Sequence, residues 1–332
     1  MLIPNKLLLR IVALLLSVGT GLLFGCYLLF LYLPTGAAGT THDLSISSGT
    51  TFTTVSKELQ QAGVIRSSLH LRLAARLRGV DRRMQAGDYR ISADMTPSHI
   101  LAKLAAGETD GRIFTLPEGY SIYQVAALLE EQALFSRTSF LAACVDRDLL
   151  ARLEIPGSSV EGYLFPGTYK VGFSMNVQGL ISEMVATFRR RTAGMQDRGL
   201  ARGMTLEQVV ILASMVEREA VAPAEKPLIA SVFLNRLRIG MPLQSDPTAI
   251  YGFKIFGGTV TRQDLQRRSS YNTYLLRGLP SGPIGNPGLE ALKAVLQPAQ
   301  TKYLYFVARK DGTHQFSETL QEHNRAVQQY LK

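Results

Sequence analysis

The segment from Thr205 to Ala220 contains the residues best suited to acid catalysis. Thr205 and Gln208 have the spacing of a capping box, which predicts that a helix begins here. From Leu206 onward the segment is apolar almost all round, as is typical of a helix buried in a large core. Glu217 is then exceptional, because burial disfavours the ionised carboxylate and favours the neutral acid that can donate a proton.

The two acids near the end of this helix are predicted to differ in direction. At about 100° per residue, Glu217 lies on the same side as Leu206, whereas Glu219 points toward Gln208. We therefore predict Glu217 as a general acid and Glu219 as a structural ion-pair partner close to Arg218. Spacing alone also allows the alternative that Glu217 is only a helix-end residue paired with an arginine.

The N-terminal segment has the composition of a membrane span. Ile11 to Leu33 contains no charged residue and is long enough to cross a hydrocarbon core of about 30 Å. Lys6 and Arg10 precede it and no Lys or Arg follows until Lys57, so the positive-inside rule places the N-terminus in the cytoplasm and the rest of the chain outside. A cleavable signal peptide, cut near residues 36–39, is the alternative, but the apolar run is long for that role.

Charge and cysteine content narrow the function classes. The net charge of +10 suits a protein that works beside anionic lipid headgroups or an acidic polymer, and a chain translocated across a membrane meets little nucleic acid. Cys26 lies within the span and leaves Cys144 without a partner, so we expect no disulfide. The five histidines lack metal-ligand spacing, and a P-loop, a dinucleotide fingerprint and a nucleophile elbow are missing, so we expect no metal and no cofactor.

A repeat precedes the catalytic helix. One pattern of apolar and glycine residues occurs twice, about seventy positions apart. It predicts the order strand, turn, helix, loop, helix in each copy. The first set is Leu44, Ile46, Gly49, Val55, Leu59 and Leu71, and the second is Phe114, Leu116, Gly119, Val125, Leu129 and Leu141. Units of this size bury little surface alone and are expected to pack together or against the next domain. The first copy resembles a LysM-like module, with a plain spacer as the alternative.

Polar and aromatic segments follow the helix. Residues 244–248 read QSDPT, residues 271–274 read YNTY, and residues 282–287 read GPIGNP within a stretch too rich in glycine and proline for a regular element. Residues 241–261 are predicted to form a few strands or extended loops. Amides, hydroxyls and tyrosine faces suit a sugar-binding groove. An ordinary glycosidase needs two flanking carboxylates, and here one acid is well placed.

These motifs, in this order, resemble those of the MltG-type (YceG-like) endolytic murein transglycosylases. The resemblance rests on ASMVERE at 213–219, NRL at 235–237, the segments above, YFVA at 305–308, and EHN at 322–324. Two departures are Ser245, where threonine is common, and Ser281, where proline is usual. The resemblance covers nearly the whole chain after the membrane span and also its topology.

The resemblance implies a carbon–oxygen lyase that acts on peptidoglycan. One glutamate protonates the glycosidic oxygen between N-acetylmuramic acid and N-acetylglucosamine and then takes the proton of the C6 hydroxyl, which closes a 1,6-anhydro ring. We expect Glu217 to perform both steps. By motif match the substrate-binding residues are Asn235, Gln244, Asp246, Thr248, Tyr271, Asn272 and Tyr274. The implied partners are nascent glycan strands and peptidoglycan synthases of the penicillin-binding type.

The predicted fold class is α+β, with a single transmembrane helix, a duplicated LysM-like module and a mixed catalytic domain built around a central buried helix. The predicted parts are a cytoplasmic segment 1–10, the span 11–33, a linker 34–42, the module 43–112, its second copy 113–190 and the catalytic domain 191–332. The predicted location is the bacterial inner membrane, with the domains in the periplasm. A lysozyme-type hydrolase, with Asp246 placing a water, and a wall-binding scaffold without activity are the alternatives.

Overall fold

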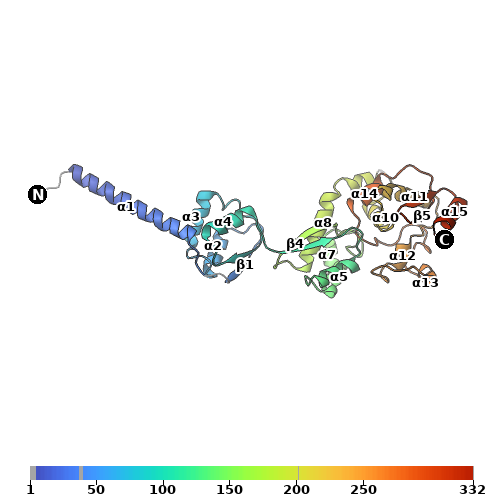
Figure 1. Ribbon diagram of the computed structural model, residues 1–332, viewed down its shortest axis with the longest axis horizontal. Helices are drawn as coiled ribbons and strands as arrows, with labels where there is room; N and C mark the ends of the chain where they lie inside the picture. The colour runs from blue at the N-terminus through green and yellow to red at the C-terminus, as the bar shows by residue number, and fades with distance from the viewer. Residues whose placement is uncertain (1–4, 37–39, 201, 332) are drawn as a thin grey trace. The chain divides into compact units, whose positions relative to one another are not determined.

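The computed structural model describes residues 5–36, 40–200 and 202–331. Parts of the predicted cytoplasmic segment (1–4) and of the predicted linker and cleavage region (37–39) therefore lie outside the described residues. The fold is a mixture of helices and short two-stranded sheets (Figure 1). Backbone contacts divide the chain into two compact units. The first unit contains the residues up to Arg112 together with Gly172–Ser174, and the second contains Ile113–Val171 and the residues from Met175 onward.

Helix α1 (Asn5–Tyr32) begins the first unit. Its segment Leu9–Tyr32 is long and apolar enough to cross a membrane, and it is the one helix of this kind in the described part of the chain. Most of its leucines are exposed, but Leu31 in its last turn is only 2% exposed and belongs to the core of the first unit. The end of α1 is therefore packed against folded protein.

The rest of the first unit is a small α+β module. It consists of β1 (Thr41–Ile46), α2 (Phe52–Gln61), α3 (Ser68–Arg78), β2 (Gly87–Ser92) and α4 (Pro97–Ala106). The two strands pair antiparallel, with Thr41 opposite Ser92 and Ile46 opposite Gly87. The three helices begin at side-chain caps, which are Thr51, Ser67 and Thr96. Leucines and isoleucines from all five elements fill one core.

The second unit starts with the same kind of order. Strand β3 (Arg112–Leu116) is followed by α5 (Ile122–Glu131), α6 (Arg137–Cys144), α7 (Arg147–Arg152), β4 (Gly167–Val171), α8 (Val177–Arg191) and α9 (Met195–Leu200), and β3 pairs with β4. Two strands separated by helices and followed by a further helix thus occur in both units. LysM-like character remains a prediction.

The C-terminal part of the second unit is mainly helical. Its elements are α10 (Leu206–Glu219), a 3-10 turn η1 (Pro223–Glu225), α11 (Lys226–Arg238), α12 (Asp246–Ile250), α13 (Arg262–Gln266), α14 (Leu289–Leu296), the antiparallel strands β5 (Tyr305–Ala308) and β6 (His314–Ser317), and α15 (Leu320–Tyr330). The capping box of α10 is confirmed, since Thr205 and Gln208 bond reciprocally. The strands or extended loops predicted for 241–261 are partly wrong, because Asp246 starts a short helix with Pro247 in its first turn.

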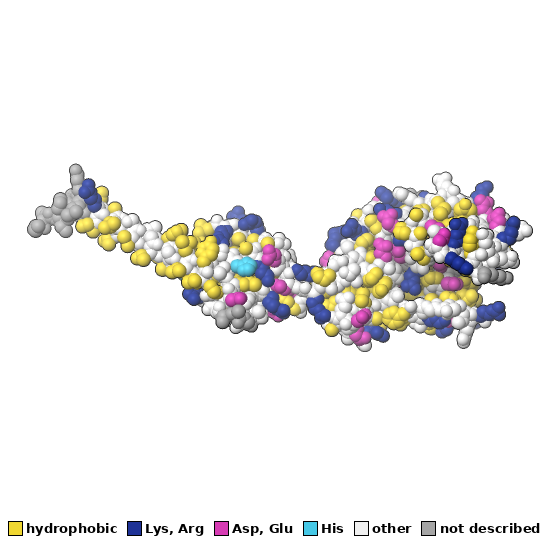
Figure 2. All heavy atoms as spheres, in the orientation of Figure 1, with side chains coloured by type: hydrophobic (Ala, Val, Ile, Leu, Met, Phe, Trp, Pro, Cys, Tyr) yellow, Lys and Arg dark blue, Asp and Glu magenta, His cyan; other side chains and the backbone are white. Residues whose placement is uncertain are grey.

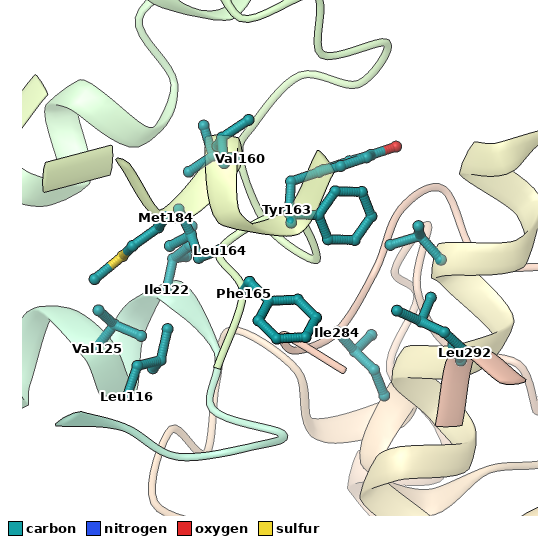
Figure 3. Packing of buried hydrophobic residues seen from close by; sticks show 14 of the residues in the cluster. Leu116, Ile122, Val125, Val160, Tyr163, Leu164, Phe165, Met184, Ile284 and Leu292 are labelled. Atoms are coloured by element: carbon teal, nitrogen blue, oxygen red, sulfur yellow. The ribbon is translucent and has the colours of Figure 1, made fainter. Parts of the chain in front are cut away.

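One hydrophobic core joins both halves of the second unit. Val125 and Phe165, from the predicted segment 113–190, belong to the same cluster as Ile284 and Leu292 (Figure 3). Helix α10 runs through this cluster, and all residues from 209 to 216 are buried. The helix that carries the two glutamates is thus enclosed in its middle part, and its last turn is only partly buried.

Candidate active site

Glu217 is held in a buried ion pair. Its Oε1 accepts a hydrogen bond from Lys226 Nζ at 2.7 Å, and its Oε2 accepts one from the Gly288 backbone N–H at 3.0 Å. The Glu217 and Lys226 side chains are only 7% and 6% exposed, and Glu118 Oε2 lies 3.6 Å from the same ammonium. Glu217 therefore ties the end of α10 to the start of α11 and to the loop before α14. This geometry agrees with the alternative stated from spacing, in which Glu217 is a helix-end residue paired with a basic residue. The basic residue is a lysine and not the expected arginine.

Glu219 lies with several of the predicted sugar-binding residues. It lines a pocket of about 280 Å³ together with Gln244, Asp246 and Tyr274. Its Oε1 accepts a hydrogen bond from the Ser245 hydroxyl at 2.6 Å. The expectation that Glu219 is a structural ion-pair partner is wrong, because its close partner is the Ser245 hydroxyl and the salt bridges of the described residues do not include it. Arg218 turns elsewhere and donates to the Gly119 carbonyl and to Gln124.

The surroundings of Glu219 keep a substantial fraction of its carboxyl group neutral near pH 7. Burial raises the pKa of Glu219 to about 7, and the negative charge of Asp246 acts in the same direction. The hydrogen bond from Ser245 and the positive charges of Arg218 and Arg236 oppose this shift. A carboxyl group with a pKa near the working pH is suited to donating a proton and then accepting one.

The segment that meets Glu219 is fixed by an unusual backbone. Gln244 has a φ of 51°, in the left-handed region that side chains other than glycine seldom adopt. Its N–H donates to the Thr273 carbonyl at 3.1 Å, and the Ser245 N–H donates to Thr273 Oγ1 at 3.0 Å. These bonds hold the strained turn and direct the Ser245 hydroxyl toward Glu219.

Tyr274 and Asp246 form a second polar group in the pocket. The Tyr274 hydroxyl donates to Asp246 Oδ1 at 2.6 Å. Burial raises the pKa of Tyr274, so its hydroxyl keeps its proton and remains a donor. The pair therefore presents a fixed carboxylate with one oxygen engaged, next to the hydrogen-bonded carboxyl of Glu219.

The same pocket is also lined by Arg236, Tyr305 and His323, which were not predicted as site residues. The Arg236 guanidinium donates to the Leu304 carbonyl at 2.7 Å and to the Leu243 carbonyl at 2.8 Å, and it lies 5.3 Å from the centroid of the Tyr305 ring. The His323 ring stacks on the same tyrosine at 5.2 Å. Burial lowers the pKa of His323, which keeps the imidazole neutral. Arg236 and His323 both belong to short motifs that carried the family resemblance. Membership of these motifs is the signal in the sequence from which they could have been predicted as pocket residues.

Other predicted site residues have structural contacts. Asn272 is fully buried, and its amide donates to the carbonyls of Leu265 and Arg267 at 3.0 and 2.8 Å. Thr248 is 1% exposed and shares a hydrogen bond with Thr273. These two residues hold the loop that carries the pocket residues.

Asn235 and Tyr271 lie outside the pocket of Glu219. The Asn235 amide donates to the carbonyls of Thr301 and Tyr303 at 2.9 and 3.0 Å, and Asn235 lines a separate pocket of about 720 Å³ beside α11. The Tyr271 ring lies 4.6 Å from the ring of Tyr251. The structure thus brings Gln244, Asp246 and Tyr274 together with Glu219, while the other predicted residues, Glu217 included, occupy neighbouring positions.

A further buried carboxylate anchors the glycine- and proline-rich loop. Glu161 is 1% exposed and accepts hydrogen bonds from the Tyr251 hydroxyl at 2.7 Å, from the Ile122 N–H at 3.0 Å and from the Asn286 amide at 3.1 Å. Burial raises the pKa of Glu161 to about 7. Asn286 Oδ1 in turn accepts from the Gly162 N–H at 2.9 Å. The loop of residues 282–287 is therefore a buried connection rather than a free rim.

Comparison with known proteins places this arrangement in a family. The model of the YceG-like family matches residues 44–329. An endolytic murein transglycosylase of Bacillus subtilis is 32% identical over 309 residues, which cover 88% of this chain and 85% of that protein. An endolytic murein transglycosylase of Streptococcus pneumoniae is 28% identical over 87% of this chain, which corresponds to 58% of the longer relative. The crystal structure of a YceG-like protein from Listeria monocytogenes aligns with a TM-score of 0.61 and 30% identity, covering 86% of this chain and 99% of that one. The chain belongs to the YceG-like family.

Proposed function

We propose that this protein is a membrane-anchored endolytic lytic transglycosylase that cleaves peptidoglycan strands between N-acetylmuramic acid and N-acetylglucosamine. The names of the relatives in Bacillus subtilis and Streptococcus pneumoniae support the reaction class. The observation that carries the proposal is Glu219, a carboxyl group with a pKa raised to about 7 in a pocket with Gln244, Asp246 and Tyr274. We propose Glu219 as the general acid in place of Glu217, the residue predicted from the sequence.

The proposed reaction needs one acid–base group. Neutral Glu219 donates its proton to the glycosidic oxygen as the bond from that oxygen to C1 of N-acetylmuramic acid breaks. The C6 hydroxyl oxygen of the same sugar then bonds to C1, and its proton passes to the Glu219 carboxylate. The product has a 1,6-anhydro ring, Glu219 returns to its neutral form, and no water is consumed.

The neighbouring residues support two requirements of this chemistry. The Ser245 hydroxyl fixes one oxygen of Glu219 and stabilises its ionised form between the two proton transfers. Asp246, held by the Tyr274 hydroxyl, places a negative charge where positive charge develops at C1. Amide and aromatic groups of the pocket, such as Gln244 and Tyr305, are suited to the hydroxyls and the apolar face of a sugar.

Anchoring forms part of the proposal. Helix α1 is suitable as a single membrane span, and the charges before it favour a cytoplasmic N-terminus and an external catalytic unit. In the bacterial inner membrane this arrangement restricts cleavage to newly made strands near the membrane and raises the effective concentration of the enzyme there. Peptidoglycan synthases of the penicillin-binding type are the proposed partners.

Analysis of the chain ends tests the reaction. The purified full chain is incubated with uncross-linked glycan strands, and the products are identified by mass spectrometry. Internal cleavage with 1,6-anhydro ends is expected. Reducing ends without anhydro rings would instead identify a hydrolase, a second candidate that is favoured by the presence of Asp246 in the pocket of Glu219. If the glycan is unchanged, a wall-binding scaffold without activity is the remaining candidate function.

A further inference from the structure

Helix α3 carries two apolar faces. Leu71, Ala74 and Ala75 point into the core of the first unit and are fully buried. Leu69, Leu73 and Leu77 follow one another at intervals of four residues and therefore form one stripe on the opposite face, spread over about 80°. Their exposed fractions are 64%, 49% and 70%. A soluble module does not need three exposed leucines in a row on one helix, so this stripe calls for a partner.

Basic residues border the leucine stripe. Arg72 and Arg76 lie one turn apart along its edge, and Arg66 precedes the helix. An apolar stripe with arginines at its border is the pattern of a helix that lies in the interface of a bilayer, with leucines among the acyl chains and guanidinium groups at the phosphates. The charge pattern thus favours a surface of anionic lipid over an apolar protein groove.

The position of α3 within the first unit agrees with this pattern. Its His70 ring lies 5.2 Å from the ring of Phe30 in the last turns of α1, and Figure 1 shows α3 beside the end of α1. An Arg66 guanidinium N–H donates to the carbonyl of Pro34, just after α1 ends, at 3.5 Å. In Figure 2 hydrophobic side chains run along α1 and continue on the adjoining part of the first unit. The stripe therefore begins beside the end of the apolar helix.

We propose that α3 is an interfacial helix that inserts Leu69, Leu73 and Leu77 into the outer leaflet and binds anionic phospholipid headgroups through Arg72 and Arg76. This inference rests on the membrane anchoring proposed above. It adds a second, peripheral attachment to the span of α1. The first unit, which already packs on the end of α1, then has two attachments to the bilayer.

The absence of tryptophan from the sequence provides a direct test. The variant Leu73→Trp of the full chain is reconstituted into vesicles of phosphatidylethanolamine and phosphatidylglycerol, with and without acyl-chain bromine as a fluorescence quencher. We expect bromine to lower the emission at least about twofold, as for a side chain at the boundary of headgroups and acyl chains. Removing the charges with Arg72→Gln and Arg76→Gln in the same background is expected to reduce this quenching in anionic vesicles and to leave it unchanged in phosphatidylcholine.

Two further single-tryptophan variants separate the possible failures. Phe24→Trp reports on α1, and Ile239→Trp reports on an exposed position of the second unit and should not be quenched. If Phe24→Trp is not quenched, the membrane span itself fails. If Phe24→Trp is quenched and Leu73→Trp is not, the span stands and the interfacial helix is refuted. Emission of Leu73→Trp that is shielded from acrylamide but insensitive to bromine would show that a protein surface covers the stripe, which also overturns the proposal.

Discussion

Glu219→Gln and Glu217→Gln, both at the end of α10, should have opposite effects on activity and on thermal stability. Glu219→Gln keeps the shape of the side chain but removes the proton donor. Loss of a general acid costs about 10²- to 10⁴-fold in rate, or about 3–5 kcal/mol of transition-state stabilisation. Glu217→Gln leaves the pocket intact, so the folded fraction of this variant should keep its activity.

Glu217→Gln should lower the stability of the protein, whereas Glu219→Gln should not. Glu217→Gln leaves the buried Lys226 ammonium without its close partner, with Glu118 at 3.6 Å as a weaker one. Breaking a buried pair from one side costs about 3–5 kcal/mol, which corresponds to a fall in Tm on the order of 10 °C. Glu219→Gln removes a carboxyl group whose pKa is raised from 4.5 to about 7. A raised acid pKa means that stability is lost as pH rises through about 7, so this variant should gain up to about 3 kcal/mol at alkaline pH and little at pH near 4.5.

The assay combines glycan digestion, with mass spectrometry of the products, and thermal unfolding at acid and alkaline pH. Glu207→Gln in the first turn of the same helix serves as the matched control, because it lies at the far end from the pocket. The assignment of Glu219 is refuted if Glu217→Gln is inactive with a Tm like that of the unmodified chain while Glu219→Gln still cleaves glycan.

Three further predictions concern the residues around Glu219. Activity should fall as pH rises through about 7, where Glu219 loses its proton, and a pH–rate profile should show this limb moved to higher pH in Ser245→Ala and nearly unmoved in Ser245→Thr, which keeps the hydroxyl. Asp246→Asn removes a negative charge that raises the pKa of Glu219, so the same limb should move to lower pH. Asn272→Ala leaves backbone carbonyls without donors and should lower Tm by about 5–10 °C in calorimetry.

Local structure was predictable where the signal is local. The capping box at Thr205 and Gln208 correctly predicted the start of α10. Short-range side-chain contacts and the helical period carry this information within a single segment. Residues 241–261 were harder to predict, because α12 is only five residues long and its neighbours decide its conformation.

The candidate site was partly predictable because its polar residues cluster in sequence. Gln244, Asp246 and Tyr274, three of the seven predicted substrate-binding residues, share one pocket. Thr273 brings the segments 244–248 and 271–274 together, because its hydroxyl accepts a hydrogen bond from the Ser245 N–H and shares one with Thr248. His323 enters the pocket from a distant part of the chain, and a pattern within one segment does not reveal such a meeting.

The roles of the two glutamates show where helical geometry stops being informative. A helical wheel separates a buried side from a solvated side, but α10 is buried all round from residue 209 to residue 216. The environment of each acid is then set by the chain that packs on its last turn. Lys226, at the start of the next helix, meets Glu217, and Ser245, from a turn beyond that helix, meets Glu219. An ammonium pairs with Glu217, whereas Glu219 meets a hydroxyl and lines a pocket. This contrast in partners, and not direction on the helix, is the reason for proposing Glu219 as the acid.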